Sequence, residues 1–266
     1  MSDHEGSFAL NRALWNARTV HHVGSKFYDV EAFLAGKNSL SAKELDLVGD
    51  VAGKSVLHLQ CHFGQDTLSF ARMGADASGL DLSDVAIAEA RKLALRTGLN
   101  ADFIEANVLE YQPALKDRFD IVFTSYGVLG WLPELGRWAE NIARYLKPGG
   151  KLVLVEFHPA VWMFNNAFTE VAYSYFNREV IEETEMATYA DGTALINLKS
   201  HGWNHAIGET MTALLDAGLR IERFEELDGS PHDCFQKTVK GADGFYRIAG
   251  MEGKLPMVYA VVASRL

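Results

Sequence analysis

The chain has 266 residues, of which 48% are hydrophobic, and this length suits one large core with an insertion. It carries 35 acidic and 25 basic residues, a formal net charge of −10, with no block of basic residues. This charge would repel a nucleic-acid backbone, so DNA and RNA are not expected as partners. An acidic surface also favours solubility in enzymes of every class, so the charge alone selects no substrate.

Nothing in the sequence predicts a membrane or secreted protein. No window approaches the roughly 20 uninterrupted apolar residues that a membrane-spanning helix needs, and the N-terminus lacks the apolar core of a signal peptide. Cys61 and Cys234 lie far apart and define no disulfide framework. We therefore expect a cytoplasmic protein with two free thiols, whose oligomeric state the sequence does not determine.

The segment that begins at Val51 predicts parallel strands joined by crossover helices, because apolar strand-like runs alternate with helical patterns. Ser83 is placed to cap one helix, Gly74 and Gly98 close two of them, and "KPGG" (147–150) ends a third. The predicted strands are 56–60, 77–81, 101–107, 119–125 and 151–158, and the predicted helices are 66–73, 85–96 and about 135–146.

Three further regions complete the predicted organisation. Residues 1–50 have a helical, aromatic pattern and are expected to form a lid over the cofactor-binding core, 51–159. Residues 160–205 are rich in aromatic side chains without a clear crossover helix, which indicates an inserted cap for the substrate. Residues 206–266 return to the core, with a predicted helix at 209–217 and strands at 221–227 and 257–264.

The loop in "SVLHLQCHFGQDTLSFA" (55–71) follows the first predicted strand and precedes a helix, as in nucleotide-binding folds. A pyrophosphate site needs several glycines so that backbone amides can close on the phosphates, but here only Gly64 fits. Asp81 ends the next strand, 17 residues after Gly64, near the spacing of about 20 for a carboxylate that accepts from ribose hydroxyls. The pattern predicts a nucleoside ligand without a pyrophosphate.

Four segments resemble the class I S-adenosylmethionine-dependent methyltransferases, in particular a bacterial subgroup whose first motif is LQCHFGQD. They are "LHLQCHFGQDTLSFARMGADASGLDLSDVAIAEARKLA", "FDIVFTSYGVLGWLPEL", "LKPGGKLVLVEFHP" and "WNHAIGETMTALLDAGLRIERFEE". The resemblance implies a doubly wound, mostly parallel seven-stranded sheet of the Rossmann-like type, with the last strand antiparallel. It also implies S-adenosylmethionine as cofactor and methyl transfer to an N, O, S or C nucleophile of a small molecule.

The resemblance also assigns the cofactor contacts. It places the 60–64 loop along the methionine moiety, Asp81 on both ribose hydroxyls, Leu82 on the adenine, and Asn107 at the adenine amino group. His58 stands where the family usually has an acidic residue. The predicted cofactor-binding residues are Tyr28, Gln60, Cys61, His62, Gly64, Gln65, Asp81, Leu82, Asn107, Val108 and Ser125.

The predicted catalytic residues are His158 and Tyr126, because each leaves a strand at the edge where cofactor and acceptor should meet. A positioned histidine can act as a general base for a hydroxyl or amine, so His158 is the first choice. Most aromatic side chains of the inserted cap are expected to be core, and some to line the acceptor pocket. The predicted substrate residues are Trp162, Tyr175 and His205.

Three of these predictions have alternatives. His58, Cys61 and His62 carry zinc-binding groups, but strand alternation turns the first two to different faces, and no metal is expected. Asp81 is alternatively a helix-capping carboxylate, although Ser83 already suits that role. For the whole chain, the alternatives are an NAD-dependent oxidoreductase, and a non-catalytic cofactor-binding partner protein.

Overall fold

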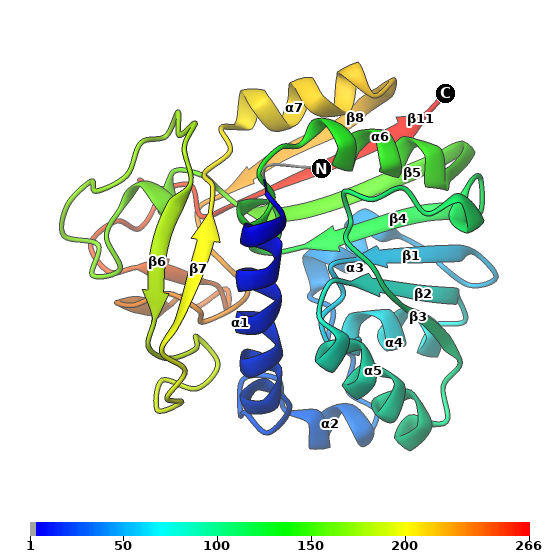
Figure 1. The fold of residues 1–266 in the computed structure, drawn as a ribbon, viewed down its shortest axis with the longest axis horizontal. Coiled ribbons are helices and arrows are strands. Elements are labelled where there is room, and N and C mark those ends of the chain that lie inside the picture. Colours follow the sequence, from blue (N-terminus) through cyan, green and yellow to red (C-terminus); the bar gives the residue numbers. More distant parts are fainter. Residues whose placement is uncertain (1–3) are drawn as a thin grey trace.

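The computed structural model describes residues 4–266, and its centre is a seven-stranded sheet with the order β3-β2-β1-β4-β5-β11-β8 (Figure 1). Strands β1 to β5 are parallel, whereas β11 runs antiparallel to both of its neighbours, so the predicted sheet is confirmed. The strands are β1 (Ser55–Leu59), β2 (Asp76–Asp81), β3 (Ala101–Glu105), β4 (Phe119–Ser125), β5 (Leu146–Phe157), β8 (Leu219–Leu227) and β11 (Val258–Arg265).

The central strands β1 and β4 are buried on both faces of the sheet, to which successive side chains point in turn. Val56 packs with Phe70 and Leu47 on one face, while Leu57 packs with Trp138 and other residues of the second core cluster. The helices are α1 (Glu5–Val23), α2 (Val30–Leu34), α3 (Ala42–Val48), α4 (Gln65–Arg72), α5 (Asp84–Thr97), α6 (Gly136–Tyr145) and α7 (Ile207–Asp216).

The helix boundaries follow the predicted signals with two differences. Ser83 caps α5, accepting a hydrogen bond of 3.0 Å from the Ala86 amide, and Gly98 ends that helix in the left-handed conformation. The "KPGG" segment ends α6 but already belongs to β5, in which Gly149 has a positive φ of 77° and the pairing register with β4 shifts. The last helix begins at Ile207, two residues before its predicted start.

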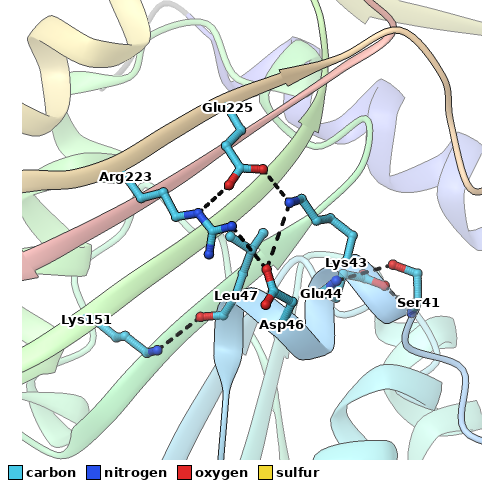
Figure 2. A network of polar contacts seen from close by, with 8 residues as sticks. All are labelled: Ser41, Lys43, Glu44, Asp46, Leu47, Lys151, Arg223 and Glu225. Carbon is cyan, nitrogen blue, oxygen red and sulfur yellow. Dashed lines mark hydrogen bonds and ion pairs between the residues drawn. The ribbon is translucent and has the colours of Figure 1, made fainter.

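Helix α3 is capped at its start and bonded to the sheet at its end (Figure 2). At its start, Ser41 and Glu44 form a capping box, in which each side chain accepts from the other residue's backbone amide. At its end, the Lys151 ammonium donates to the carbonyl oxygens of Leu47 and Val48, at 3.0 and 2.9 Å. A cation is favourable there because the last carbonyls of a helix carry partial negative charge.

Ion pairs connect the same helix to the edge strand β8 (Figure 2). Lys43 and Arg223 both pair with Glu225, and Arg223 also contacts Asp46 at 3.1 Å. Exposed pairs contribute little singly, but a network with shared partners holds a helix in one place. Helix α3 is therefore part of the core.

Helix α1 is attached to the insertion instead, and Figure 1 shows it crossing the carboxyl ends of the strands beside the β6–β7 hairpin. The Asn11 side chain donates to the His201 carbonyl and accepts from its amide, so it pairs with the backbone of β7. Arg18 forms an ion pair with Glu185 of β6 at 3.1 Å. The hairpin consists of β6 (Ile181–Glu185) and β7 (Leu198–Gly202).

A second excursion from the sheet, between β8 and β11, has no counterpart in the predicted organisation. It contains the short hairpin of β9 (Thr238–Lys240) and β10 (Tyr246–Ile248). Phe235 of this segment packs against Phe157 and Trp162, with ring centroids 4.8 and 5.3 Å apart. The insertion that follows β5 and the segment between β8 and β11 therefore meet at the carboxyl end of β5. Across residues 4–266, no helix has the length and apolar character needed to cross a membrane.

Candidate functional site

The candidate site lies at the carboxyl ends of β2, β1 and β4, which are neighbours in the sheet. The chain order reverses beside β1, since β2 and β3 lie on one side of it and β4 and β5 on the other. Open parallel sheets bind ligands at such a switch point, where the loops that follow neighbouring strands diverge. The predicted residues Gln60, Asp81 and Ser125 all meet at this edge.

The loop after β1 is held in an unusual backbone conformation. Gln60, His62 and Gly64 have φ angles of 54°, 51° and 81°, in the left-handed region. At Gly64 the glycine is required by space as well, since a Cβ there would lie 2.6 Å from the Phe103 ring. Strained non-glycine residues persist where the surroundings impose them, and they cluster at functional sites. The loop therefore keeps the shape of a glycine-rich turn while presenting side chains.

A hydrogen bond to Asp81 helps to hold the loop in this backbone conformation. Its carboxylate accepts a hydrogen bond from the His62 amide and another from the Ser83 amide, both at 2.8 Å. Burial raises the pKa of Asp81 to about 6 although these amides favour the charged form. Each carboxylate oxygen retains a lone pair, so the group can also accept from two ribose hydroxyls. Ser83 caps α5, so Asp81 is not the helix cap.

Aromatic and basic side chains cover the loop from the side of α1. His22 Nδ1 lies 2.9 Å from His62 Nε2, and the Trp15 ring meets the His62 ring edge-on. Arg18 lies over the rings of Trp15 and Trp131, 5.0 and 5.4 Å from their centroids. Burial lowers the pKa of His22 to about 3 and that of His62 well below its ordinary value, so both imidazoles are neutral.

Three buried polar atoms in this region have no hydrogen-bond partner within residues 4–266: Arg18 Nε, His22 Nε2 and Gln60 Oε1. A buried polar atom without a partner costs about 1 to 3 kcal/mol, so such a group indicates a site for a ligand or water. The sequence reasoning did not find Arg18 or His22. Their spacing with Trp15 places all three on one helix face, but that pattern occurs equally in ordinary helices.

Tyr28 and Gln65 connect the loop after β1 with the segment that follows α1 and with Tyr189, between β6 and β7. The hydroxyl oxygens of Tyr28 and Tyr189 lie 2.5 Å apart, and the Gln65 side chain donates to the Tyr28 carbonyl at 2.9 Å. Burial raises the pKa of the Tyr28 hydroxyl well above its ordinary value, so it remains protonated. These contacts bring Tyr28 to the loop, and its role in cofactor binding stays a prediction.

The residues predicted for the adenine lie beyond Asp81. Strands β2 and β3 pair in parallel, so Leu82 and Asn107 follow neighbouring strand ends. Asn107 Oδ1 accepts from the Leu109 amide at 3.0 Å, which orients the side-chain amide and leaves one lone pair on the oxygen. Val108 is buried, and its carbonyl accepts from the Asn141 side chain at 3.0 Å. The role of these residues in adenine binding stays a prediction.

The loop after β4 is fixed by Glu156, which lies near the end of β5. This buried carboxylate accepts hydrogen bonds from four backbone amides, those of residues 127, 128, 129 and 157. The Gln60 side chain donates to the Val128 carbonyl at 2.9 Å, so the loop after β4 is also joined to the loop after β1. Burial raises the pKa of Glu156, and the amides oppose that rise.

Tyr126 begins this loop with a φ of 37°, another strained value. Its ring packs edge-on against His232 and is tilted against Phe157, and its hydroxyl is buried without a hydrogen-bond partner in the described chain. Burial, and then the Glu44 carboxyl, raise the pKa of this hydroxyl well above its ordinary value. Tyr126 is therefore protonated at neutral pH, and its alignment role stays a prediction.

His158, the predicted base, is engaged at both ring nitrogens. Nδ1 accepts from the Ala160 amide at 3.0 Å, so the proton of the neutral ring lies on Nε2, which is 2.9 Å from Glu226. Burial lowers the pKa of His158, and Glu226 partly opposes this. Neither nitrogen has a free lone pair for an acceptor's proton in this arrangement. Its catalytic role stays a prediction that this geometry does not favour.

The predicted substrate residues have different surroundings. The Tyr175 hydroxyl accepts from the Ile207 amide at 3.2 Å, at the start of α7. His205 lies between Glu209 (2.8 Å from Nδ1) and the Leu132 carbonyl (2.7 Å from Nε2). Trp162 is 41% exposed, and it lines a small cavity together with His205. Only these two of the three predicted residues meet at a cavity.

His58 and Cys61 belong to the packing of the sheet. His58 Nδ1 lies 3.0 Å from the Thr67 hydroxyl, and burial lowers the pKa of the ring to about 3. Cys61 Sγ fills the space above Gly79, where a Cβ would lie 2.7 Å from it. Among the residues that the structure describes, no group of three or more His, Cys, Asp or Glu side chains is arranged to hold a metal ion.

A mostly parallel sheet with one reversed strand, and a carboxylate that ends β2 beside a strained loop after β1, define the Rossmann-like methyltransferase fold. Comparison with known proteins agrees. A family model described as a methyltransferase domain matches residues 56–150. The ubiquinone biosynthesis O-methyltransferase of Thiobacillus denitrificans is 30% identical over 205 residues, covering 76% of this chain and 79% of the relative.

The match to the corresponding enzyme of Erwinia tasmaniensis is shorter: it is 30% identical over 134 residues, and the chain spans 55% of that relative. Solved methyltransferase structures from Mesorhizobium loti and Listeria monocytogenes share the fold, with TM-scores of 0.57 and 0.63 at 21% and 16% identity. They cover 87% and 84% of this chain, and 100% and 95% of their own chains. The chain belongs to the S-adenosylmethionine-dependent methyltransferases, and S-adenosylmethionine is its cofactor.

Asp81 gives the first testable prediction. Replacing it by alanine removes a charged hydrogen-bond acceptor, so Asp81→Ala should weaken binding of S-adenosylhomocysteine by about 1.5 to 3 kcal/mol. Titration calorimetry at pH 7.5 measures the effect. The control is Asp76→Ala, which removes a carboxylate from the opposite end of the same strand and should leave the affinity unchanged. Equal affinities of the two variants would remove Asp81 from the site.

The pKa of Asp81 gives a second prediction. Ribose hydroxyls donate best to the ionised carboxylate, so affinity should rise about tenfold from pH 5 to pH 7.5 as a group with pKa about 6 loses its proton. His22 and His62, above the loop, stay neutral throughout this range. The Asp81→Asn variant should bind weakly with a flat pH profile. A slope equal to that of the wild type would assign the titration to another group.

Glu156 gives a third prediction. In Glu156→Gln one side-chain oxygen becomes an NH₂ group, which cannot accept, so two backbone amides lose their partner. The free energy of unfolding should fall by about 1 to 3 kcal/mol in urea denaturation. Glu226→Gln is the matched control, because the Glu226 side chain is 51% exposed and should tolerate the change. A Glu156→Gln protein as stable as the control would show that the carboxylate does not hold the loop.

Proposed function

We propose that this chain transfers a methyl group to a nucleophilic oxygen or nitrogen atom of a small molecule, by in-line displacement. The observation that carries the proposal is the arrangement at Asp81, where a partly buried carboxylate with free lone pairs fixes a strained loop at the switch point of the sheet. An oxygen acceptor is supported by the relatives in Erwinia and Thiobacillus, which are named as O-methyltransferases.

The residues present fit the cofactor. Asp81 would hold its ribose, the loop of residues 60–64 its methionine moiety, and Leu82 and Asn107 its adenine. Arg18, with an unpaired buried Nε, and Gln60, with an unpaired buried Oε1, offer further polar contacts. When bound, S-adenosylmethionine supplies an electrophilic methyl group on a sulfonium ion.

The chain's own contribution is placement and exclusion of water. The loop after β4 is held by Glu156 and by Gln60, so the groups that face cofactor and acceptor are fixed before either binds. The aromatic cover of Trp15, Tyr28 and Trp131 excludes water from the loop after β1. Because both nitrogens of His158 are engaged, we infer that alignment contributes more to this reaction than a histidine base.

A direct assay tests the proposal against its alternatives. Purified protein is incubated with S-adenosylmethionine labelled in its methyl group and a bacterial metabolite extract, and the label is followed into small molecules. Transfer is expected with wild-type protein and at a much lower rate with Asp81→Ala. An NAD-dependent oxidoreductase would instead bind NADH in calorimetry and leave the label in the cofactor. A non-catalytic partner protein would bind S-adenosylhomocysteine without any transfer.

The proposed lid is tested by truncation. Deleting residues 1–24 removes α1 but leaves α3, which is anchored to the sheet independently. The shortened protein should retain its sheet, measured by circular dichroism, and should bind S-adenosylhomocysteine at least about tenfold more weakly. Arg18→Ala should reproduce part of this loss, whereas Arg12→Ala, at a 43% exposed side chain of the same helix, should not. Full affinity of the truncated protein would show that α1 closes no site.

The proposed role of His158 is tested once an acceptor is known. A histidine base contributes about 10² to 10⁴-fold, so His158→Ala should lower turnover by at least about tenfold if the sequence prediction holds. The hydrogen bonds of His158 lead us to expect a smaller change, with cofactor affinity intact. The pH profile separates the two cases, because loss of a base also removes the wild-type rise in rate with pH.

A further inference from the structure

A small cavity lies between the loop after β4, the end of β5 and the segment that follows β7. Its volume is about 20 Å³, which is room for one water molecule or for one hydroxyl or amino group. Its walls are mostly apolar and aromatic, with Phe157, Trp162 and Trp203 among them. Leu129 and Gly130 connect it to the loop that Gln60 joins to the loop after β1. The cavity is therefore adjacent to the proposed cofactor site without being part of it.

Most polar groups at this cavity are already paired. Glu156 accepts from four backbone amides, and His205 is bonded at both ring nitrogens. Asn204 differs from them. Its side-chain nitrogen donates to the carbonyl oxygens of Pro159 and Ser174, both at 3.2 Å, and carbonyls can only accept. The orientation of the amide is therefore fixed, with Oδ1 as the remaining atom.

Asn204 Oδ1 is buried and has no hydrogen-bond partner in the part of the chain that the structure describes. The residue is 2% exposed, so bulk water does not satisfy this oxygen. Leaving a buried acceptor unpaired is unfavourable, and native structures nearly always provide a partner. The partner has to be a donor, because an amide oxygen can only accept.

We infer that Asn204 Oδ1 receives a hydrogen bond from a hydroxyl or N–H group of the methyl acceptor, an inference that rests on the proposed function. The donor group occupies the cavity, while the body of the acceptor stays at its rim beside Trp162, which is 41% exposed. A flat, uncharged aromatic ring of the acceptor would pack well against the aromatic side chains that line the cavity. A carboxylate does not suit the cavity, because it would face the Asn204 oxygen and the buried Glu156 carboxylate.

The chemical class of acceptor is therefore a neutral aromatic alcohol or amine. A site built to pair with a substrate OH or NH discriminates strongly against an analogue that lacks it, since the buried group is then left unpaired. Asn204 is thus assigned as a specificity-determining residue. The alternative occupant is a single buried water that never leaves, in which case Asn204 has only a structural role.

The test compares three probes of similar shape: phenol, which donates, anisole, which cannot, and benzoate, which is anionic. Dissociation constants are measured by NMR titration with and without saturating S-adenosylhomocysteine. Wild-type protein should bind phenol about tenfold more tightly than anisole or benzoate, the factor expected for one hydrogen bond to a buried group. A phenol-to-anisole ratio near one would overturn the inference.

Two substitutions locate the effect at Asn204. Asn204→Leu should abolish the preference for phenol, whereas Asn204→Asp, which keeps an acceptor oxygen, should retain it even if stability falls. A purely structural role would change the affinities for both aromatic probes alike and leave their ratio intact in Asn204→Leu. If that variant fails to fold, the wild-type ratio and the Asp variant still decide. A crystal structure with phenol, in which Oδ1 is bonded to a retained water, would also contradict the inference.

The cofactor titration is run first, so that the two proposals fail separately. If the wild-type protein does not bind S-adenosylhomocysteine, the proposed function is overturned. The ratio of phenol to anisole affinity without cofactor reports on Asn204 alone.

Discussion

The hydrogen bond between the His62 amide and the Asp81 carboxylate connects the features on which the site depends. It crosses from the end of β2 to the loop after β1 and holds a backbone in which two non-glycine residues have positive φ angles. A glycine-rich loop adopts this shape at little steric cost, whereas this loop requires an external partner. The consequence is a turn that keeps the side chains of Gln60 and His62 at the position where a cofactor would lie.

Two carboxylates at the same edge of the sheet, Glu156 (buried) and Asp81 (partly buried), differ in how many hydrogen bonds they accept. Glu156 accepts from four backbone amides, which saturates its lone pairs and makes it a structural anchor for the loop after β4. Asp81 accepts from two, and burial raises its pKa to about 6. The lone pairs that remain on the Asp81 oxygens can accept hydrogen bonds from further donors.

Much of the fold follows from local patterns that one sequence contains. The alternation of apolar runs with capped helices predicts the parallel sheet, and Ser83 caps α5 as its position indicates. The spacing between Gly64 and Asp81 predicts that Asp81 lies beside the loop after β1. Other contacts do not follow from local patterns: Glu226 at His158, Glu185 at Arg18 and Pro159 at Asn204 come from distant parts of the chain, and no local period encodes them. The same holds for the hairpin of β9 and β10, whose strands are too short to give a pattern.

The central claim is that Asp81 and the strained loop hold the nucleoside part of S-adenosylmethionine. A crystal structure with S-adenosylhomocysteine tests it most directly. The predicted result places both ribose hydroxyls within hydrogen-bonding distance of the Asp81 carboxylate while the His62 amide remains bonded to it. A nucleoside bound elsewhere, or an Asp81 carboxylate bonded only to the two backbone amides with the cofactor present, would contradict the claim.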